Sequence, residues 1–392
     1  MMSNFKICDI GYVSLNHENE QLCGDNIQIV RPNNQTSVLV LADGLGSGVK
    51  ANILSTLTAK MISTMMANNI SLEECVKAVM EALPVCKERK VAYSTFTIAK
   101  VIENRYVEIY NYDNPKPFLI HNGKVKELSM KCDEIAQKKI YYTKLIMEEN
   151  DTLFLMSDGM IYAGQDQNLN YDWDLPQIYS YAESFYDENS SAKSIATVLI
   201  DYVNTLYGKK PSDDVTCAVL KIRKRNHINV LIGPSENKAD DEKMLSLFFS
   251  KEGKHIVCGG STSQMVAQYL KKDLMVLKES PAEDIPPISI IDGVDLVTEG
   301  AVTLNKVLQY SENLLKDNQD YFTWFYMEDG ASQLARFLFE EATDIDFFIG
   351  CAVNPIYQNR SNRLLEKTKM KIIEELIANL KETGKNIKVS YF

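Results

Sequence analysis

Aspartate residues stand at the ends of apolar runs in the first half of the sequence. They are Asp25, Asp43, Asp158, Asp213 and Asp214. Two of them, Asp43 and Asp158, end an apolar run and are followed at once by glycine. One Asp-Gly pair alone is typical of a tight turn, because Gly tolerates positive φ and Asp bonds its own backbone. A set of strand ends that each carry a carboxylate instead predicts a shared site.

Converging carboxylates point to bound metal ions. Two carboxylates about 4 Å apart repel each other by roughly 4 kcal/mol at an effective dielectric constant near 20. Several together raise each other's pKa unless cations lie between them. Oxygen ligands select hard ions such as Mg²⁺ or Mn²⁺, and two such ions can activate water and bind a phosphoryl oxygen. This chemistry needs no protein nucleophile, and the sequence shows no evident Ser/His or Cys/His arrangement.

The elements around these aspartates predict an α+β domain. Strands are expected at 5–15, 25–30, 37–42, 94–102, 106–112, 118–125, 151–157 and 215–222. Apolar residues recur at helical spacing between Ser47 and Ala67 and again over 195–206. Ser71 and Glu74 form a capping box for another helix. Strands at hairpin spacing with helices beside them favour antiparallel sheets flanked by helices.

The pattern changes after the basic segment 221–229, and we place a domain boundary near Asn226. Beyond it single strands alternate with helices, which are expected near 240–250, from Ser261, from about Ala301 and from Arg363. This alternation predicts a smaller α/β domain with a mostly parallel, doubly wound sheet. The predicted domains are therefore residues 1–225 and 226–392.

Composition limits the partners. The 392 residues carry a net charge of −11, which argues against nucleic acid or an anionic membrane, since both bind basic surfaces. The eight cysteines form no CxxC pair, and most lie in apolar runs as buried thiols do. No signal peptide and no apolar run of membrane-spanning length is evident, so we expect a cytoplasmic protein.

Six motifs resemble those of a known enzyme family. They are "CGDN", "LADGLGSGVKAN", "YSTFTIAKV", "NPKPFLI", "FLMSDGM" and "SDDVTCAVL". Their order and spacing over about residues 5–222 resemble the type 2C protein phosphatases, specifically the bacterial stage II sporulation protein E branch. That resemblance implies a β-sandwich of two antiparallel sheets with flanking helices. It also implies hydrolysis of phosphoserine or phosphothreonine by a metal-bound water, with two Mn²⁺ or Mg²⁺ ions as cofactors.

The resemblance also assigns roles to individual residues. Asp43 would bridge both ions, and the Gly44 carbonyl would bind one of them. Asp25 resembles the ligand of the first strands, and Asp158 and Asp213 resemble ligands of the other ion. The family has Asp-Asn where this chain has Asp213-Asp214, so the ligand is either Asp213 or Asp214. Through the metal-bound water, Asp43, Asp158 and Asp213 would be the catalytic residues.

The second domain contains a candidate anion site. A predicted strand ends in two glycines, and Ser-Thr-Ser then opens a helix, so that the site would consist of Gly259, Gly260, Ser261, Thr262 and Ser263. Exposed amides at a helix start favour an anion, although a capped βα turn explains the same residues. With the acidic loop 292–300, the stretch resembles sugar-phosphate isomerase and deoxyribose-repressor ligand domains. That resemblance implies a small-molecule ligand.

The leading hypothesis is a metal-dependent protein serine/threonine phosphatase in bacterial signalling, with a sensor or docking module at its C-terminus. The family suggests a phosphorylated regulator, such as an anti-sigma-factor antagonist, as the substrate, and a homodimer is left open. One alternative is a regulatory binding protein whose second domain senses a phosphorylated metabolite. Another is a phosphatase of small phosphoesters.

Overall fold

The computed structural model describes residues 6–82, 94–165, 173–277, 280, 284–352 and 360–392, with side chains from 369 onward in the last range. Its contacts divide the chain into two compact units, Met1–Lys224 and Arg225–Phe392. Among the described residues, no helix is long and apolar enough to cross a lipid bilayer.

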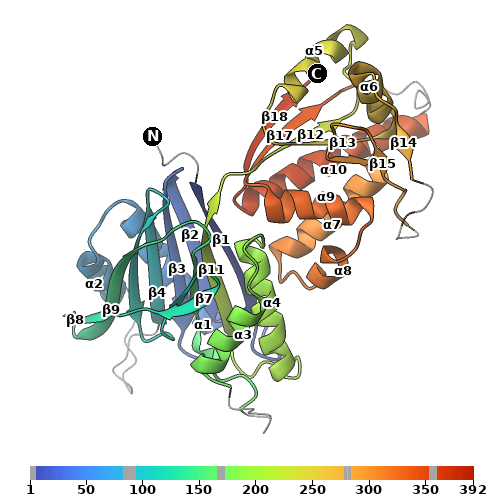
Figure 1. Cartoon of the computed structure of the whole chain (residues 1–392). Coiled ribbons are helices and arrows are strands. Elements are labelled where there is room, and N and C mark those ends of the chain that lie inside the picture. The colour runs from blue at the N-terminus through green and yellow to red at the C-terminus, as the bar shows by residue number, and fades with distance from the viewer. Residues whose placement is uncertain (1–5, 83–93, 166–172, 278–279, 281–283, 353–359) are drawn as a thin grey trace. The chain divides into compact units, whose positions relative to one another are not determined.

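Two antiparallel sheets build the N-terminal unit (Figure 1). One has the order β1-β11-β10-β6-β7. Its strands are β1 (Lys6–Leu15), β6 (Phe118–His121), β7 (Lys124–Glu127), β10 (Thr152–Met156) and β11 (Val215–Lys224). The other has the order β2-β3-β4-β5-β9-β8. Its strands are β2 (Asp25–Asn33), β3 (Thr36–Gly44), β4 (Ser94–Ile102), β5 (Tyr106–Tyr112), β8 (Lys131–Ile135) and β9 (Lys138–Ile146).

Side-chain alternation along the strands separates three apolar layers. In β3, Leu39 and Leu41 face the other sheet, where they pack with Leu153, Leu155 and residues of β11. The residues between them, such as Val40, face the opposite way and pack under α1 (Gly48–Ala67) and α2 (Leu72–Ala82). Such alternation is expected for strands with both faces buried.

Helices α3 (Leu175–Phe185) and α4 (Ala192–Leu206) cover the outer face of the five-stranded sheet. The unit is thus a β-sandwich with helices on both outer faces, as predicted from the sequence. The sequence did not predict α3, β8 or β9. The tight approach of α4 to β1 depends on Gly11, since a Cβ there would lie 2.3 Å from the Lys193 Cα.

One helix differs in detail from its sequence pattern. We expected the apolar residues of α1 to face the core, and Leu54 and Ile62 do so. Val49, Ile53 and Leu57 are instead 62%, 53% and 47% exposed. The buried face of α1 also contains small residues such as Ala51, Ala59 and Ser55, which let the helix lie close to β2 and β3. Apolar spacing alone therefore predicted the helix but not its buried face.

The C-terminal unit is an α/β domain with a mixed sheet in the order β14-β15-β16-β13-β12-β17-β18. Its strands are β12 (His227–Ile232), β13 (Lys254–Cys258), β14 (Met275–Val276), β15 (Ser289–Ile290), β16 (Leu296–Thr298), β17 (Asp344–Ile349) and β18 (Asn386–Tyr391). The five strands from β16 to β18 run parallel, and the short hairpin β14–β15 adds antiparallel strands at one edge.

Helices connect the parallel strands, as the doubly wound prediction requires (Figure 1). They are α5 (Asp241–Phe249), α6 (Gly260–Leu270), α7 (Ala301–Leu315), α8 (Tyr321–Phe325), α9 (Gly330–Ala335) and α10 (Arg360–Glu382). The predicted helices near 240–250, from Ser261, from Ala301 and from Arg363 correspond to α5, α6, α7 and α10. The short helices α8 and α9 and the strands β16 and β18 were not predicted.

Candidate metal centre

The fold brings the predicted aspartates to one end of the sandwich. Asp25 lies directly opposite Asp43 in the β2–β3 register. By strand alternation, Asp25 shares the inward face of Ile27, and Asp43 shares that of Leu41. Asp214 precedes β11 by one residue and is in phase with Ala218, which also faces the inter-sheet core. Carboxylates from both sheets therefore close one end of an apolar core.

Asp158 and Asp213 complete the group. Asp158 begins a single 3-10 turn, Asp158–Met160, directly after β10. The ladder continues past β10 through a 3.0 Å hydrogen bond from the Ser157 amide to the Thr216 carbonyl. This pairing holds the turn beside the chain that enters β11. Asp213 accepts a 2.9 Å hydrogen bond from the Asp214 amide, which fixes the two adjacent carboxylates relative to each other.

Both Asp-Gly pairs need glycine for a reason other than a positive φ. Neither Gly44 nor Gly159 has a positive φ. A Cβ on Gly44 would lie 2.1 Å from the Ala51 carbonyl oxygen, and a Cβ on Gly159 would lie 2.3 Å from the Asp214 carbonyl oxygen. In each pair the glycine thus lets a second backbone segment pack against the aspartate. The glycines that have a positive φ in the turn between β3 and α1 are Gly46 and Gly48.

Burial and mutual repulsion disfavour the charged forms of these side chains. Burial is the main cause that raises the Asp43 pKa to about 9, and the carboxylates of Asp25, Asp158, Asp213 and Asp214 add to it. Burial likewise raises the Asp25 pKa to about 7, partly offset by the nearby hydroxyls of Ser157 and Thr216.

The outer carboxylates show the same direction. Burial and the charge of Asp158 raise the Asp213 pKa to about 6. Burial also raises the Asp158 pKa, and a hydrogen bond from the Asp43 carboxyl opposes that shift. Five carboxylates that repel each other in a buried position form a site that divalent cations would stabilise.

Three carboxylate oxygens in this cluster are buried without a partner. Among the described residues, neither oxygen of Asp25 makes a hydrogen bond, and the same holds for Asp214 Oδ2. The Ser157 and Thr216 hydroxyls lie close enough to Asp25 to lower its pKa, but they fall outside hydrogen-bond geometry. Buried acceptors normally have a donor, so these orphaned oxygens point to a missing positive ligand.

The carboxylates are near each other but not yet gathered around one point. Within the part of the chain that the structure describes, no three His, Cys, Asp or Glu side chains have the arrangement of a formed metal site. The donor set is nevertheless suitable in type and burial for hard divalent ions.

Two residues outside the predicted set hold Asp214 in place. The His17 amide donates a 3.0 Å hydrogen bond to Asp214 Oδ1, from a loop 197 positions away in sequence. Gly24 leaves room for the other oxygen, since a Cβ there would lie 2.5 Å from Asp214 Oδ2. The motif "CGDN" contained the Gly24 signal, whereas a backbone amide such as that of His17 has no signature in the sequence.

The predicted anion site of the C-terminal unit has a different arrangement. The Thr262 hydroxyl accepts a hydrogen bond from the Gly233 amide, and the Ser263 hydroxyl donates one to the Gly259 carbonyl, at 3.0 and 2.8 Å. These two side chains therefore bind groups inside the domain. Ser261 is exposed, and Gly260 has open space around it.

Comparison with known protein families finds a match in the N-terminal unit. Residues 33–223 match the family model "Stage II sporulation protein E (SpoIIE)", so that Asp25 lies just before the matched segment. No curated protein sequence matches the chain.

Solved structures with similarity to this chain include the phosphatase domain with a fragment of the regulatory domain of SpoIIE from Bacillus subtilis. It has 18% identity and a TM-score of 0.47, over 56% of this chain and 65% of that one. The SpoIIE phosphatase domain in a crystal form without domain swapping has 16% identity and a TM-score of 0.44, over 56% and 93%. The RsbU and RsbW domains of Rv1364c from Mycobacterium tuberculosis have 14% identity and a TM-score of 0.45, over 56% and 62%.

The match spans less than two thirds of the first and third of these solved chains, 65% and 62%. The family assignment therefore concerns the N-terminal unit, and it rests on the family model. Residues 33–223 of this chain are thus similar to the stage II sporulation protein E family, whose model they match.

Proposed function

We propose that the N-terminal unit is a metal-dependent phosphatase that hydrolyses phosphoserine or phosphothreonine in a protein. The observation that carries this proposal is the buried group of carboxylates, in which Asp25 faces Asp43 and both oxygens of Asp25 lack a partner among the described residues. Similarity to the stage II sporulation protein E family, a branch of the type 2C phosphatases, supports the choice of a phosphoester as the substrate.

The proposed ligands divide into two groups. Asp43 is electrostatically coupled to all four other aspartates, so it is the best candidate to lie between two ions. Asp25 and Asp214 are buried and would contribute the unpartnered oxygens on one side. Asp158 and Asp213 are half-buried and influence each other on the more open side, where a phosphoester would enter. The Gly44 carbonyl is the remaining proposed ligand.

Bound Mn²⁺ or Mg²⁺ would supply a hydroxide nucleophile at neutral pH and neutralise charge on the phosphoryl group. The chain itself provides rigidity and exclusion of water. Ala51, at the start of α1, lies against Gly44, and the apolar core below the site, including Leu41, is buried. Among the described residues, no Lys or Arg offsets the burial and the four neighbouring carboxylates that raise the Asp43 pKa.

The C-terminal unit is proposed to be a sensor or docking module in bacterial signalling. Its separate hydrophobic core and parallel sheet support a distinct module, and a phosphorylated regulator such as an anti-sigma-factor antagonist is the proposed substrate class from the family.

Substrate comparison tests the proposal. The purified full chain with Mn²⁺ should hydrolyse a phosphoserine peptide, and p-nitrophenyl phosphate more slowly, and a chelator should stop both reactions. Asp158→Asn should lower turnover at least about a hundredfold, whereas the exposed Asp133→Asn should not change it. Hydrolysis of a small phosphoester but not of any phosphopeptide would favour the small-molecule alternative. Equal activity of Asp158→Asn and wild type would reject the assignment.

A further inference from the structure

The strand order of the C-terminal unit marks a place where ligands bind in related architectures. From β12 the chain continues outward through β13 to β16, and it then returns to the other side of β12 with β17 and β18. The topological switch point therefore lies between β12 and β17. In open parallel sheets, ligands bind outside the carboxyl ends of the strands at such a point.

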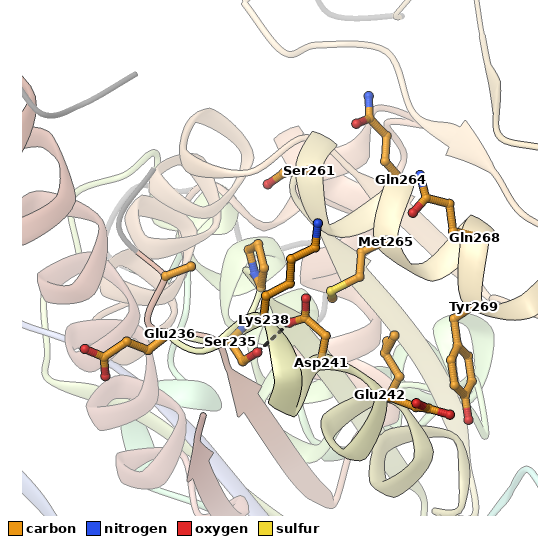
Figure 2. Close-up of a pocket in the computed structure, with 13 residues that line it drawn as sticks. Ser235, Glu236, Lys238, Asp241, Glu242, Ser261, Gln264, Met265, Gln268 and Tyr269 are labelled. Atoms are coloured by element: carbon orange, nitrogen blue, oxygen red, sulfur yellow. Dashed lines mark hydrogen bonds between the residues drawn. The ribbon is translucent and has the colours of Figure 1, made fainter. Parts of the chain in front are cut away.

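A cavity of about 650 Å³ opens beside this point. Its wall comes from the loop after β12, from α5, from one face of α6, and from Ala352 after β17 (Figure 2). The volume lies in the range of small-molecule sites. Leu245 is buried and Met265 half-buried, and together they give the cavity an apolar floor.

The lining has one basic group, Lys238, and three carboxylates, those of Glu236, Asp241 and Glu242. The Glu236 side chain is directed away from the other lining side chains (Figure 2). Lys238 extends toward Ser261 at the start of α6, whereas Glu242 lies near Tyr269, further along the same two helices (Figure 2). Asp241 stands between them. Its Oδ1 accepts hydrogen bonds from the Ser235 amide at 2.9 Å and the Ser235 hydroxyl at 2.5 Å, which fix the loop after β12 against α5.

Each end of the cavity suits a different ligand group. The Lys238 end has an ammonium group and the uncapped start of α6, which has no acidic residue in its first turn. Both favour a negative group. The opposite end has the Glu242 carboxylate, and the Asp241 carboxylate lies between the two ends. Both belong to the first turn of α5, favour a positive group and oppose an anion. Across the described residues, the Lys238 and Glu242 side chains make no ion pair with the protein that would neutralise them.

We propose that this cavity binds a small zwitterion, with its anionic group at Lys238 and Ser261 and its ammonium group at Asp241 and Glu242. A purely anionic metabolite would leave the α5 carboxylates facing a negative ligand. A simple amine would leave Lys238 without a counter-charge. Gln264 and Gln268, one helical turn apart on α6, line the same cavity and can hydrogen-bond hydroxyl groups between the two charges.

Binding to the full chain can be measured by titration calorimetry in EDTA, so that the phosphatase unit neither holds ions nor turns over phosphoesters. The probes are glucosamine 6-phosphate and its two single-charge analogues, glucose 6-phosphate and glucosamine. O-Phosphoethanolamine, ethyl phosphate and ethanolamine repeat the comparison without the sugar. At least one zwitterion should bind about tenfold or more tightly than both of its analogues, as expected for one added charge-assisted hydrogen bond.

Two variants locate the charges, and both residues are exposed. Glu242→Gln should weaken binding of the zwitterion and of the amine about tenfold and should not weaken binding of the phosphate analogue. Lys238→Gln should weaken binding of the zwitterion and of the phosphate analogue and should not weaken binding of the amine. Glu252→Gln and Lys243→Gln are matched controls, since these exposed residues lie outside the cavity lining, and they should change nothing.

Three results would overturn the inference. One is that no zwitterion binds more tightly than both of its analogues. Another is that glucosamine 6-phosphate binds no more tightly than glucose 6-phosphate and is insensitive to Glu242→Gln, which would mean an anion site alone. The third is an equal loss of binding in the control variants, which would mean non-specific attraction. All of these outcomes are independent of phosphatase activity.

Discussion

Asp25 and Asp43 lie directly opposite each other on the antiparallel strands β2 and β3, with both side chains directed to the inter-sheet face. Like charges in cross-strand pairs destabilise a sheet, and burial increases the cost. The protein retains this pair at the end of the apolar layer between its two sheets. The repulsion between Asp25 and Asp43 lowers the stability of the metal-free fold. The same two carboxylates are suitable ligands for cations, which explains why the pair is present.

Removing the Asp25 charge should affect folding stability and phosphatase activity in different directions. In the absence of metal, Asp25→Asn should raise the denaturant midpoint or leave it unchanged, because it removes a buried carboxylate without a partner. In the presence of Mn²⁺ the same variant should lose most phosphatase activity. Urea unfolding in EDTA, measured beside a phosphoserine-peptide assay, tests both points. A variant that unfolds more easily in EDTA would show that Asp25 has a structural role instead.

The metal-free protein should lose stability as the pH rises. The folded pKa values of Asp213, Asp25 and Asp43, about 6, 7 and 9, all exceed the ordinary value of 3.8. The folded state therefore binds more protons than the unfolded state between about pH 4 and pH 9, and stability present at low pH is lost across this window.

Melting temperatures in EDTA at several pH values measure this effect. The temperature should fall from pH 5 to pH 8.5 in the wild type, and the decrease should be smaller in Asp43→Asn. Mn²⁺ should largely cancel the decrease, because it stabilises the ionised carboxylates. An identical pH profile for the wild type and Asp43→Asn would contradict the electrostatic picture of the site.

Gly44 should be intolerant of even one methyl group. Gly44→Ala would place a Cβ 2.1 Å from the Ala51 carbonyl oxygen, so α1 must shift away from β3. We expect a loss of about 1–3 kcal/mol in unfolding free energy. Gly260→Ala is the matched control, since its Cβ would meet open space at an ordinary φ. Equal stability of the two variants would show that α1 is not held closely at this position.

Helix α1 offers a second matched pair. Leu54 is 5% exposed and belongs to the core under the helix, whereas Leu57 is 47% exposed. Leu54→Ala should cost about 2–4 kcal/mol of unfolding free energy, and Leu57→Ala less than about 0.5 kcal/mol. Denaturant unfolding of the two variants measures both losses. Comparable losses would mean that Leu57 is covered in solution.

The sequence predicted antiparallel sheets with flanking helices from strands at hairpin spacing, and the family resemblance implied that these sheets form a sandwich. It predicted the aspartates because strand ends such as Asp43-Gly44 are visible as an apolar run that stops at a carboxylate. It did not predict that Gly44 serves the packing of Ala51, because that contact depends on the path of a helix. The hydrogen bond from the His17 amide to Asp214 could not be predicted from the sequence either, because a backbone amide leaves no mark in the residue types.

The second unit was predicted less completely, for similar physical reasons. Its parallel strands are continuous apolar runs, and the long helices between them are clearly periodic. The helices α8 and α9 are too short to show a period. The cavity between α5 and α6 arises from side chains far apart in sequence, such as Lys238 and Ser261, and only the folded chain brings them to one opening.

The most direct test of the account is the number of Mn²⁺ ions that the chain binds at neutral pH, measured by equilibrium dialysis on metal-free protein. We predict two tightly bound ions per wild-type chain, and the loss of at least one of them in Asp43→Asn. The control Asp133→Asn, which changes an exposed carboxylate to the same amide, should still bind two. Wild-type stoichiometry in Asp43→Asn, or no tight Mn²⁺ binding by the wild type, would contradict the claim that these aspartates form a metal centre.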